Sequence, residues 1–217
     1  MSRAGVEIEQ EARLLNENEI FVRRTSGMGI MSPEMALRMR VTGPNLRAVG
    51  ISNDLRIDEP YLKYREVDFD VPTYTESDVL ARYYVRIKEI YESVKILRQC
   101  IQKLPEGPIN TPDAKQVLPD KGEVYSKMEE LIHDFMIVNF GNTPEKGIEA
   151  YQAIESAKGE LGFYAISDGK GYPFRLKIRS PSFTNLGALA TMMKGAMISD
   201  IVAIIGSIDP VMGEADK

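Results

Sequence analysis

The clearest pattern in the chain is a stripe of apolar residues between residues 77 and 104. Its members recur at steps of three and four, the spacing of one face of an α-helix. They are Val79, Leu80, Tyr83, Ile87, Ile90, Val94, Leu97 and Ile101. Ser77 can cap the first turn, and Leu104-Pro105-Glu106-Gly107-Pro108 ends the pattern. The spacing predicts one long helix that begins after Ser77.

Three weaker helical patterns accompany this stripe. Residues 1–17 are charged and carry few apolar side chains, which indicates the end of a longer helix. Ser32 and Pro33 begin a short helix over residues 33–40, since Ser caps orphan amides and Pro suits the first helical position. A helix over residues 123–139 has one apolar face, made by Val124, Met128, Leu131, Phe135 and Val138.

The period then changes to that of a β-hairpin. Two apolar runs, residues 161–167 and 174–179, flank Asp168-Gly169 and predict paired strands. In the second strand Phe174, Leu176 and Ile178 face one way. Arg175, Lys177 and Arg179 face the other way, either to hold an anion or acidic partner or as the solvated face of the strand.

The remaining segments complete the expected fold. Residues 43–72 read mostly as loop, and structureless runs of that length are usually functional or packed on a partner. Residues 186–197 predict a helix rich in Met and Ala. Residues 199–207 predict a helix that is apolar almost all round and must therefore be buried. The pattern indicates an α+β chain that is mainly helical, with a hairpin near residues 161–179.

Composition narrows the possible functions. The 217 residues are 43% apolar, which suits a packed core. The net charge of −5 leaves no basic footprint, so no nucleic-acid partner is expected. One cysteine, Cys100, and one histidine, His133, cannot make an internal disulfide, an iron–sulfur cluster or a multi-histidine metal site. Any redox cofactor must therefore come largely from another chain.

Several smaller features have two interpretations. His133 beside the apolar face of its helix is either a proton relay or ligand, or a satisfied structural histidine. Residues 168–171 and Gly27-Met28-Gly29 contain glycines, but they lack the spacing of phosphate or dinucleotide loops. The longest apolar stretch, residues 201–205, is far shorter than the roughly 20 residues that span a bilayer.

A short acidic tail follows the last predicted helix. Pro210 disfavours helix at Asp209 and turns the chain. Asp209 and Glu214 are close in sequence. In an apolar cavity their pKa values would rise, and the two groups could handle protons. The alternative is a frayed acidic C-terminus.

Eight short motifs follow one another along the chain. They are Gly43-Pro44-Asn45-Leu46-Arg47, Asp54-Leu55-Arg56, Asp68-Phe69-Asp70-Val71-Pro72, Arg82-Tyr83-Tyr84-Val85-Arg86, Met128-Glu129-Glu130-Leu131-Ile132-His133, Lys158-Gly159-Glu160-Leu161-Gly162-Phe163-Tyr164, Lys177-Ile178-Arg179-Ser180-Pro181-Ser182-Phe183 and Asp209-Pro210-Val211-Met212-Gly213-Glu214. In this order they resemble the C-terminal half of the 49-kDa family of respiratory complex I (NADH-quinone oxidoreductase), also called the NuoD family. The resemblance extends from about residue 18 to residue 217.

The resemblance implies a fold. The family is similar to the large subunit of NiFe hydrogenases, whose terminal motif Asp-Pro-Cys-x-x-Cys holds the metal. Here Val211 and Glu214 stand where those cysteines would be, and neither can replace a thiolate on nickel. The resemblance thus implies a vacated metal site within a single hydrogenase-like domain over residues 1–217.

The resemblance also implies a site. In complex I the vacated site is part of the quinone pocket, beside a 4Fe–4S cluster in a NuoB-type subunit. The tail, residues 208–217, would lie at that pocket, with Val211, Met212 and Gly213 binding quinone. Asp209 and Glu214 would tune protonation or the shape of the pocket. Quinone is then the substrate, this chain alone binds no cofactor, and NAD and FMN are bound by other subunits.

The implied partners follow from the length. Family chains are about twice as long, so an N-terminal half is expected on a separate chain, unless this is a fragment. NuoB-, NuoC- and NuoI-type subunits and the membrane arm are the other expected partners. The location would be the cytoplasmic face of a bacterial inner membrane or the mitochondrial matrix face. Two alternatives remain: a relative that uses ferredoxin, a deazaflavin or a hydrogenase-like complex as donor, and a purely structural scaffold.

Overall fold

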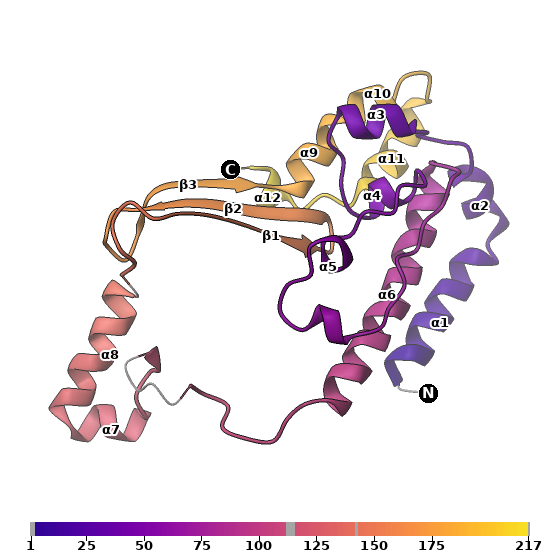
Figure 1. Cartoon of the computed structure of the whole chain (residues 1–217). Helices are drawn as coiled ribbons and strands as arrows, with labels where there is room; N and C mark the ends of the chain where they lie inside the picture. Colours follow the sequence, from indigo (N-terminus) through magenta and orange to yellow (C-terminus); the bar gives the residue numbers. More distant parts are fainter. Residues whose placement is uncertain (1–2, 112–115, 142, 217) are drawn as a thin grey trace. The chain divides into compact units, whose positions relative to one another are not determined.

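The computed structural model describes residues 3–111, 116–141 and 143–216 (Figure 1). The ends of two predicted segments, residues 1–2 and 217, lie outside this range. The chain forms two compact units. Unit 1 comprises residues 1–103, 153–162 and 179–217, and unit 2 comprises residues 104–152 and 163–178. Helices combine with one three-stranded antiparallel sheet, so the predicted α+β class is confirmed.

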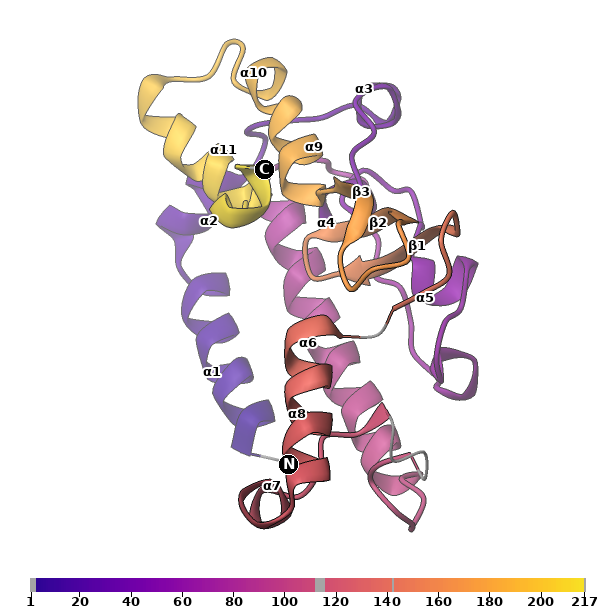
Figure 2. The ribbon, with the colours of Figure 1, turned by 90° about the vertical axis from the view of Figure 1, so that its left-hand side faces the viewer.

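The first part of unit 1 is helical and ends in one long helix, α6. In chain order they are α1 (Arg3–Asn16), α2 (Glu19–Thr25), α3 (Pro33–Arg38), α4 (Pro44–Arg47), α5 (Leu55–Asp58), a 3₁₀ turn (Tyr64–Glu66) and α6 (Val79–Gln102). Helix α1 runs beside α6 (Figure 2). Ser32 caps α3 as predicted, and its side chain accepts a hydrogen bond from the amide of Met35. The predicted loop between residues 43 and 72 contains only short helical turns.

Helix α6 confirms the strongest sequence pattern, but its cap is one residue later than predicted. Asp78, not Ser77, is the N-cap, and its carboxylate accepts from the amides of Ala81 and Gly27, each at 2.7 Å. Ser77 is left-handed, with φ of 62°, so its side chain is not at the cap position. A carboxylate is the stronger acceptor for amides at the positive end of a helix.

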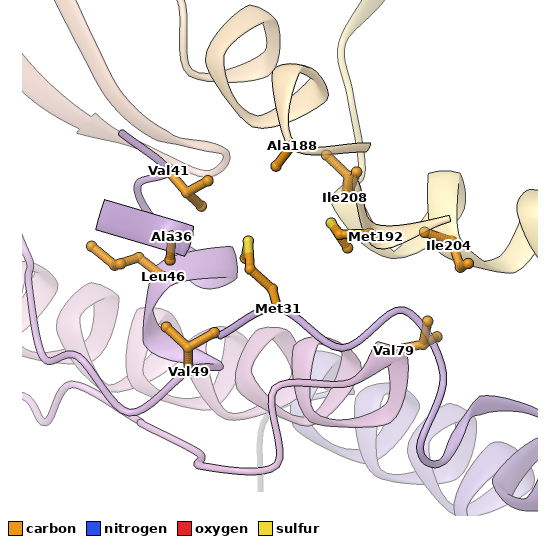
Figure 3. Packing of buried hydrophobic residues seen from close by; sticks show 10 residues of the cluster. All are labelled: Met31, Ala36, Val41, Leu46, Val49, Val79, Ala188, Met192, Ile204 and Ile208. Atoms are coloured by element: carbon orange, nitrogen blue, oxygen red, sulfur yellow. The ribbon is translucent and has the colours of Figure 1, made fainter. Parts of the chain in front are cut away.

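The core of unit 1 lies between α3, α4, the start of α6 and the C-terminal helices (Figure 3). Its buried members are Met31, Ala36, Val41, Leu46, Val49, Val79, Ala188, Met192, Ile204 and Ile208. Segments distant in sequence therefore share one apolar cluster. Met192 and Met193 pack in or against it, as expected of adaptable packing, whereas Met197 is exposed.

The C-terminal helices differ from the prediction. They are α9 (Pro181–Gly187), α10 (Leu189–Met192), a 3₁₀ turn (Ile198–Asp200), α11 (Ile201–Ile208) and α12 (Met212–Ala215). The predicted helix over residues 186–197 is correct only for residues 186–187 and 189–192. Ser180 and Pro181 begin α9 earlier, and after Met192 the chain continues as a turn in which Gly195 adopts φ of 83°. The helix over residues 199–207 is confirmed, but Val202 on it is exposed rather than buried.

Unit 2 contains two helices where the sequence predicted one. They are α7 (Lys121–Ser126) and α8 (Met128–Phe140), separated by Lys127 in an extended conformation. The Ser126 hydroxyl donates to the carbonyl of Gly122 at 2.9 Å, and such bonding competes with continued helix. Among the described residues of α7 and α8 none is buried.

The sheet has the strand order β1-β2-β3, from β1 (Glu149–Ser156), β2 (Gly159–Ser167) and β3 (Pro173–Arg179). Strands β2 and β3 confirm the predicted hairpin. Strand β1 was missed because its sequence alternates poorly. Most of β3 is exposed on both faces, so the expected apolar and solvated faces do not separate there.

Backbones cross very closely at the turn between β1 and β2. A Cβ added at Gly43 would lie 2.4 Å from Cα of Gly159, where a side chain cannot fit. The Asn185 amide joins the same segments, accepting from the amide of Thr42 at 3.2 Å and donating to the carbonyl of Lys158 at 3.2 Å. This crossing places the β1–β2 turn beside the start of the tail.

Candidate functional site

The tail begins where α11 ends. Asp209 is left-handed, with φ of 55° and ψ of 56°, and Pro210 follows it. Proline clashes with a right-handed helical residue before it, and Asp is one of the few residues that tolerate the left-handed region. The predicted turn at Pro210 is therefore confirmed. Beyond it the chain forms the short helix α12, which lies against α9 in unit 1.

The Asp209 carboxylate lies between two cations. Its Oδ2 atom forms an ion pair with Lys158 of the β1–β2 turn and lies 3.7 Å from Nε of Arg86 on α6. Asp209 is thus held by the long helix and by the turn of the hairpin. Its surroundings are charged, unlike the apolar cavity in which the sequence hypothesis placed it.

Glu214 has different partners. Its Oε2 atom accepts from the hydroxyl of Ser182 at 2.6 Å. The same Ser182 oxygen accepts from the amide of Val211 at 3.1 Å. Ser182 is fully buried at the start of α9 and so ties both Val211 and Glu214 of the tail to the protein. The structure gives Asp209 and Glu214 separate partners among the described residues.

The apolar side chains of the tail point away from these contacts. Val211 is 41% exposed and Met212 is 71% exposed, and Gly213 is exposed as well. Asp209 and Glu214 are therefore anchored, while the apolar side chains between them are accessible. Anchored backbone with accessible apolar side chains can bind an apolar ligand without a large loss of conformational entropy.

A cavity of about 330 Å³ adjoins Asp209 in unit 1. Seven ionisable side chains line it, namely Arg47, Arg56, Arg86, Glu89, Glu155, Lys158 and Asp209. Four of these side chains are cations and three are carboxylates. The nearby carboxylate of Asp54, which pairs with Arg56 through both of its oxygens, makes the numbers of positive and negative charges equal. A charge-balanced cavity of this kind favours water or a neutral polar ligand over a free anion.

Arg47 is the centre of the charged cluster. Its side chain is only 1% exposed. Its Nε donates to Glu89 at 2.6 Å, and its Nη1 donates to Glu155 at 2.9 Å and to the carbonyl of Asn53 at 2.8 Å. Helices α4 and α6 and strand β1 are thus joined through one guanidinium group.

Burial shifts the pKa values in this cluster. Desolvation raises the pKa of Glu89 and of Glu155, although Arg47 opposes both shifts. The pKa of Arg47 is also raised, because its carboxylate neighbours together outweigh desolvation. Desolvation lowers the pKa of Arg86, and Asp209 opposes that shift. The cluster is held together by mutual charge compensation.

Sequence reasoning found the tail but not this cluster. Arg82, Arg86 and Glu89 recur on α6 at steps of four and three, beside the apolar stripe. Polar residues at that spacing on a buried face are a signal of buried ion pairs. Their partners, such as Glu155, could not be named, because they lie far away in the sequence.

The remaining candidates are placed as follows. His133 lies on α8, and its Nε2 atom is 3.1 Å from the carbonyl oxygen of Val117, in agreement with its structural interpretation. The Arg179 guanidinium donates to the carbonyl of Glu160 at 2.6 Å and is part of the hairpin, while Arg175 and Lys177 are exposed. Within the described residues, no three His, Cys, Asp or Glu side chains cluster as metal ligands. The same residues include no helix long and apolar enough to cross a bilayer.

Comparisons with known proteins agree with the motifs. A family model described as respiratory-chain NADH dehydrogenase, 49 Kd subunit, matches residues 2–217. The D-type subunit of NADH-quinone oxidoreductase from Salinibacter ruber is 54% identical over 204 residues, which are 94% of this chain and 45% of the relative. A D-type subunit of the same oxidoreductase from Chloroherpeton thalassium is 53% identical over 210 residues, 97% of this chain and 48% of the relative. The chain spans about half the length of these curated relatives, and it belongs to the 49-kDa subunit family of the respiratory-chain NADH dehydrogenase.

Proposed function

We propose that this chain helps to form the quinone-reduction site in the peripheral arm of a proton-pumping NADH:quinone oxidoreductase. The names of its relatives support the complex, and the tail supports the site. The observation that carries the proposal is the exposure of Val211 and Met212 between two anchored carboxylates. A quinone ring and its isoprenoid tail are apolar, and such side chains suit them.

In this proposal the chain supplies binding groups and no electron carrier. A 4Fe–4S cluster held by a NuoB-type subunit would supply the two electrons one at a time, and two protons would complete the quinol. Val211, Met212 and Gly213 contact the quinone, while Asp209 and Glu214 set the shape and charge of the pocket. Val211 and Glu214 stand where a hydrogenase-like ancestor would have its metal-binding cysteines.

The proposed partners provide what this chain lacks. They are the N-terminal part of the same subunit on another chain, NuoB-, NuoC- and NuoI-type subunits, and the membrane arm. NAD and FMN are bound by further subunits. We place this chain peripherally on the cytoplasmic face of a bacterial inner membrane, in keeping with the bacterial sources of the relatives, with the mitochondrial matrix face as the alternative.

The test uses the assembled complex with Val211→Met or Glu214→Gln. The larger Met side chain in Val211→Met should raise the quinone KM on the order of tenfold, because one extra methylene in an apolar pocket changes affinity by about that factor. Glu214→Gln weakens the bond from Ser182 and should raise KM about threefold. Val202→Met, an equally conservative change at an exposed position on α11, should leave KM unchanged.

Unchanged rate, quinone KM and inhibitor sensitivity in both tail variants would show that the placement is wrong. A photoreactive quinone analogue separates the site from a scaffold. Crosslinks to residues 211–213 support the proposal, and labelling of partner chains alone favours a purely structural subunit. The presence or absence of an NADH- and flavin-binding subunit in the purified complex distinguishes NADH from ferredoxin or deazaflavin as the donor.

A further inference from the structure

Two arginines one turn apart on α6 are bonded differently. Arg82 is fully buried, and each of its guanidinium nitrogens donates a hydrogen bond. Its Nε donates to Ser207 at 2.9 Å, Nη1 to the carbonyl of Ser77 at 3.0 Å, and Nη2 to the carbonyl of Gly29 at 2.9 Å. This is the pattern of an arginine whose role is structural, since a buried donor without an acceptor is costly.

In Arg86, by contrast, not every guanidinium nitrogen has a hydrogen-bond acceptor. Its Nη2 donates to the carbonyl of Ile208 at 3.1 Å and to Asn45 at 3.3 Å, and its Nη1 donates to the carbonyl of Arg82 at 3.1 Å. Its Nε is buried and has no hydrogen-bond partner among the described residues. The nearest carboxylate oxygen is Oδ2 of Asp209, at 3.7 Å.

These contacts meet at the first residues of the tail. Ile208 ends α11, and its carbonyl accepts from Arg86 and, at 3.3 Å, from the side-chain Nδ2 of Asn45. Carbonyls at the end of a helix need outside donors, and a cation there is favoured by the helix dipole. The next residue, Asp209, is left-handed, a conformation that persists only where the surroundings enforce it.

We propose that Arg86 is a positioning residue for the quinone-binding tail. It fixes the Ile208 carbonyl, which sets the direction in which the chain leaves α11. Its Nε faces the Asp209 carboxylate, which it holds opposite Lys158. Val211 and Met212 follow two and three residues later, so a change at Arg86 displaces the side chains that contact quinone. The inference rests on the proposed function of the tail.

The test compares Arg86→Gln and Arg86→Lys with Arg82→Lys in the assembled complex. Arg86→Gln removes the charge that faces Asp209 and weakens the hold on the Ile208 carbonyl, so the tail should shift and the quinone KM should rise by about tenfold. In Arg86→Lys the single ammonium group can reach either the Ile208 carbonyl or the Asp209 carboxylate but not both, so this variant should give an intermediate quinone KM. The value of kcat and electron transfer from NADH to a water-soluble acceptor should stay near wild type.

Arg82→Lys is the matched control, because it makes the same change one turn earlier on the same helix. It should lower the thermal stability of the complex but leave the quinone KM unchanged. If Arg86→Gln does not assemble, Arg86→Lys and Asp209→Asn replace it, and each should raise KM in the same direction. Equal effects of Arg82→Lys and Arg86→Lys, or an unchanged KM in the Arg86 and Asp209 variants, would overturn the proposal.

The two proposals fail in different ways. If Val211→Met raises the quinone KM and the Arg86 variants do not, the tail binds quinone but Arg86 does not position it. If neither Val211→Met nor Glu214→Gln changes KM or inhibitor sensitivity, the proposed function itself fails.

Discussion

Helices α6 and α8 were predicted from the same kind of apolar spacing, yet they differ in burial. In the first two turns of α6, Val79, Ala81 and Val85 are buried. On α8 the corresponding side chains Phe135 and Val138 are exposed, and none of its described residues is buried. Neighbouring elements cover the first turns of α6, whereas Ile90, Leu97 and Ile101 farther along its apolar stripe are exposed, like the face of α8.

The comparison shows what helical spacing can and cannot predict. Spacing identifies the face that would gain from leaving water. Whether that face is covered depends on a second surface, which for α6 is provided by α4 and α11 of unit 1. On α8 no described residue is buried, so its apolar face is the one that would gain most from such a second surface.

The largest effect is expected where unit 1 buries charge. Arg47→Met leaves Glu89, Glu155 and Asp54 without their shared cation, which should lower the free energy of unfolding by about 3–5 kcal/mol. Urea denaturation of the chain measures this loss. Arg23→Met breaks a solvent-exposed pair with Glu19 and should change stability by less than about 0.5 kcal/mol. Similar losses of unfolding free energy in Arg47→Met and Arg23→Met would show that burial of the ion pairs does not determine their contribution to stability.

The next effect separates backbone conformation from close packing. Gly43 and Gly141 have nearly the same angles, φ of 71° and 62° with ψ of −148° and −163°. A Cβ at Gly43 would collide with Gly159, whereas nothing lies within 4 Å of one at Gly141. Gly43→Ala should therefore lower the unfolding free energy by about 3 kcal/mol, and Gly141→Ala by about 1 kcal/mol. Equal losses would mean that only the backbone angles matter.

The most direct test of the comparison removes the same atoms from each helix. Val85 is 0% exposed on α6, and Val138 is 66% exposed on α8. Val85→Ala should cost about 2 kcal/mol, from lost burial of two methyl groups and the cavity left behind. Val138→Ala should be close to neutral in urea unfolding of the chain. A loss at Val138 that matches the loss at Val85 would show that α8 is covered after all.

The smallest effect is local to the tail. Ser182→Ala removes the acceptor of the Val211 amide and the donor to Glu214, at a cost of about 1 kcal/mol. Hydrogen exchange should become faster at the Val211 amide, while amides in the first turns of α6 keep their protection. Ser126→Ala, which removes a hydroxyl bonded within its own helix turn, should leave the tail unaffected. Faster exchange throughout unit 1 would contradict a local anchoring role.

Much of the fold was predictable where the signal is local. The α6 stripe, the Ser32-Pro33 helix start and the β2–β3 hairpin all follow from side-chain period and turn residues. The same Ser-Pro rule, applied to Ser180 and Pro181, would have found α9. The errors at Ser77, Lys127 and residues 186–197 arise where neighbouring hydrogen bonds and a glycine changed the helix ends.

The candidate site was predictable only in part. The turn at Asp209-Pro210 follows from the restriction that proline places on the preceding residue. The charged cluster joins Arg47 to Glu155, 108 residues away, and no local pattern reports such a pair. The Ser182–Glu214 bond is likewise set by how α9 and α12 pack.

The sequence by itself determined the family, the long helix, the hairpin and the turn that begins the tail. Each depends on residue order, side-chain period or a steric restriction between neighbours. Only the tertiary structure decided which apolar faces are covered, which carboxylate each arginine meets, and that Asp209 and Glu214 are anchored while Val211 and Met212 stay accessible. The physical reason is that burial and charge pairing are free energies of contact between distant segments, and they exist only after those segments have come together.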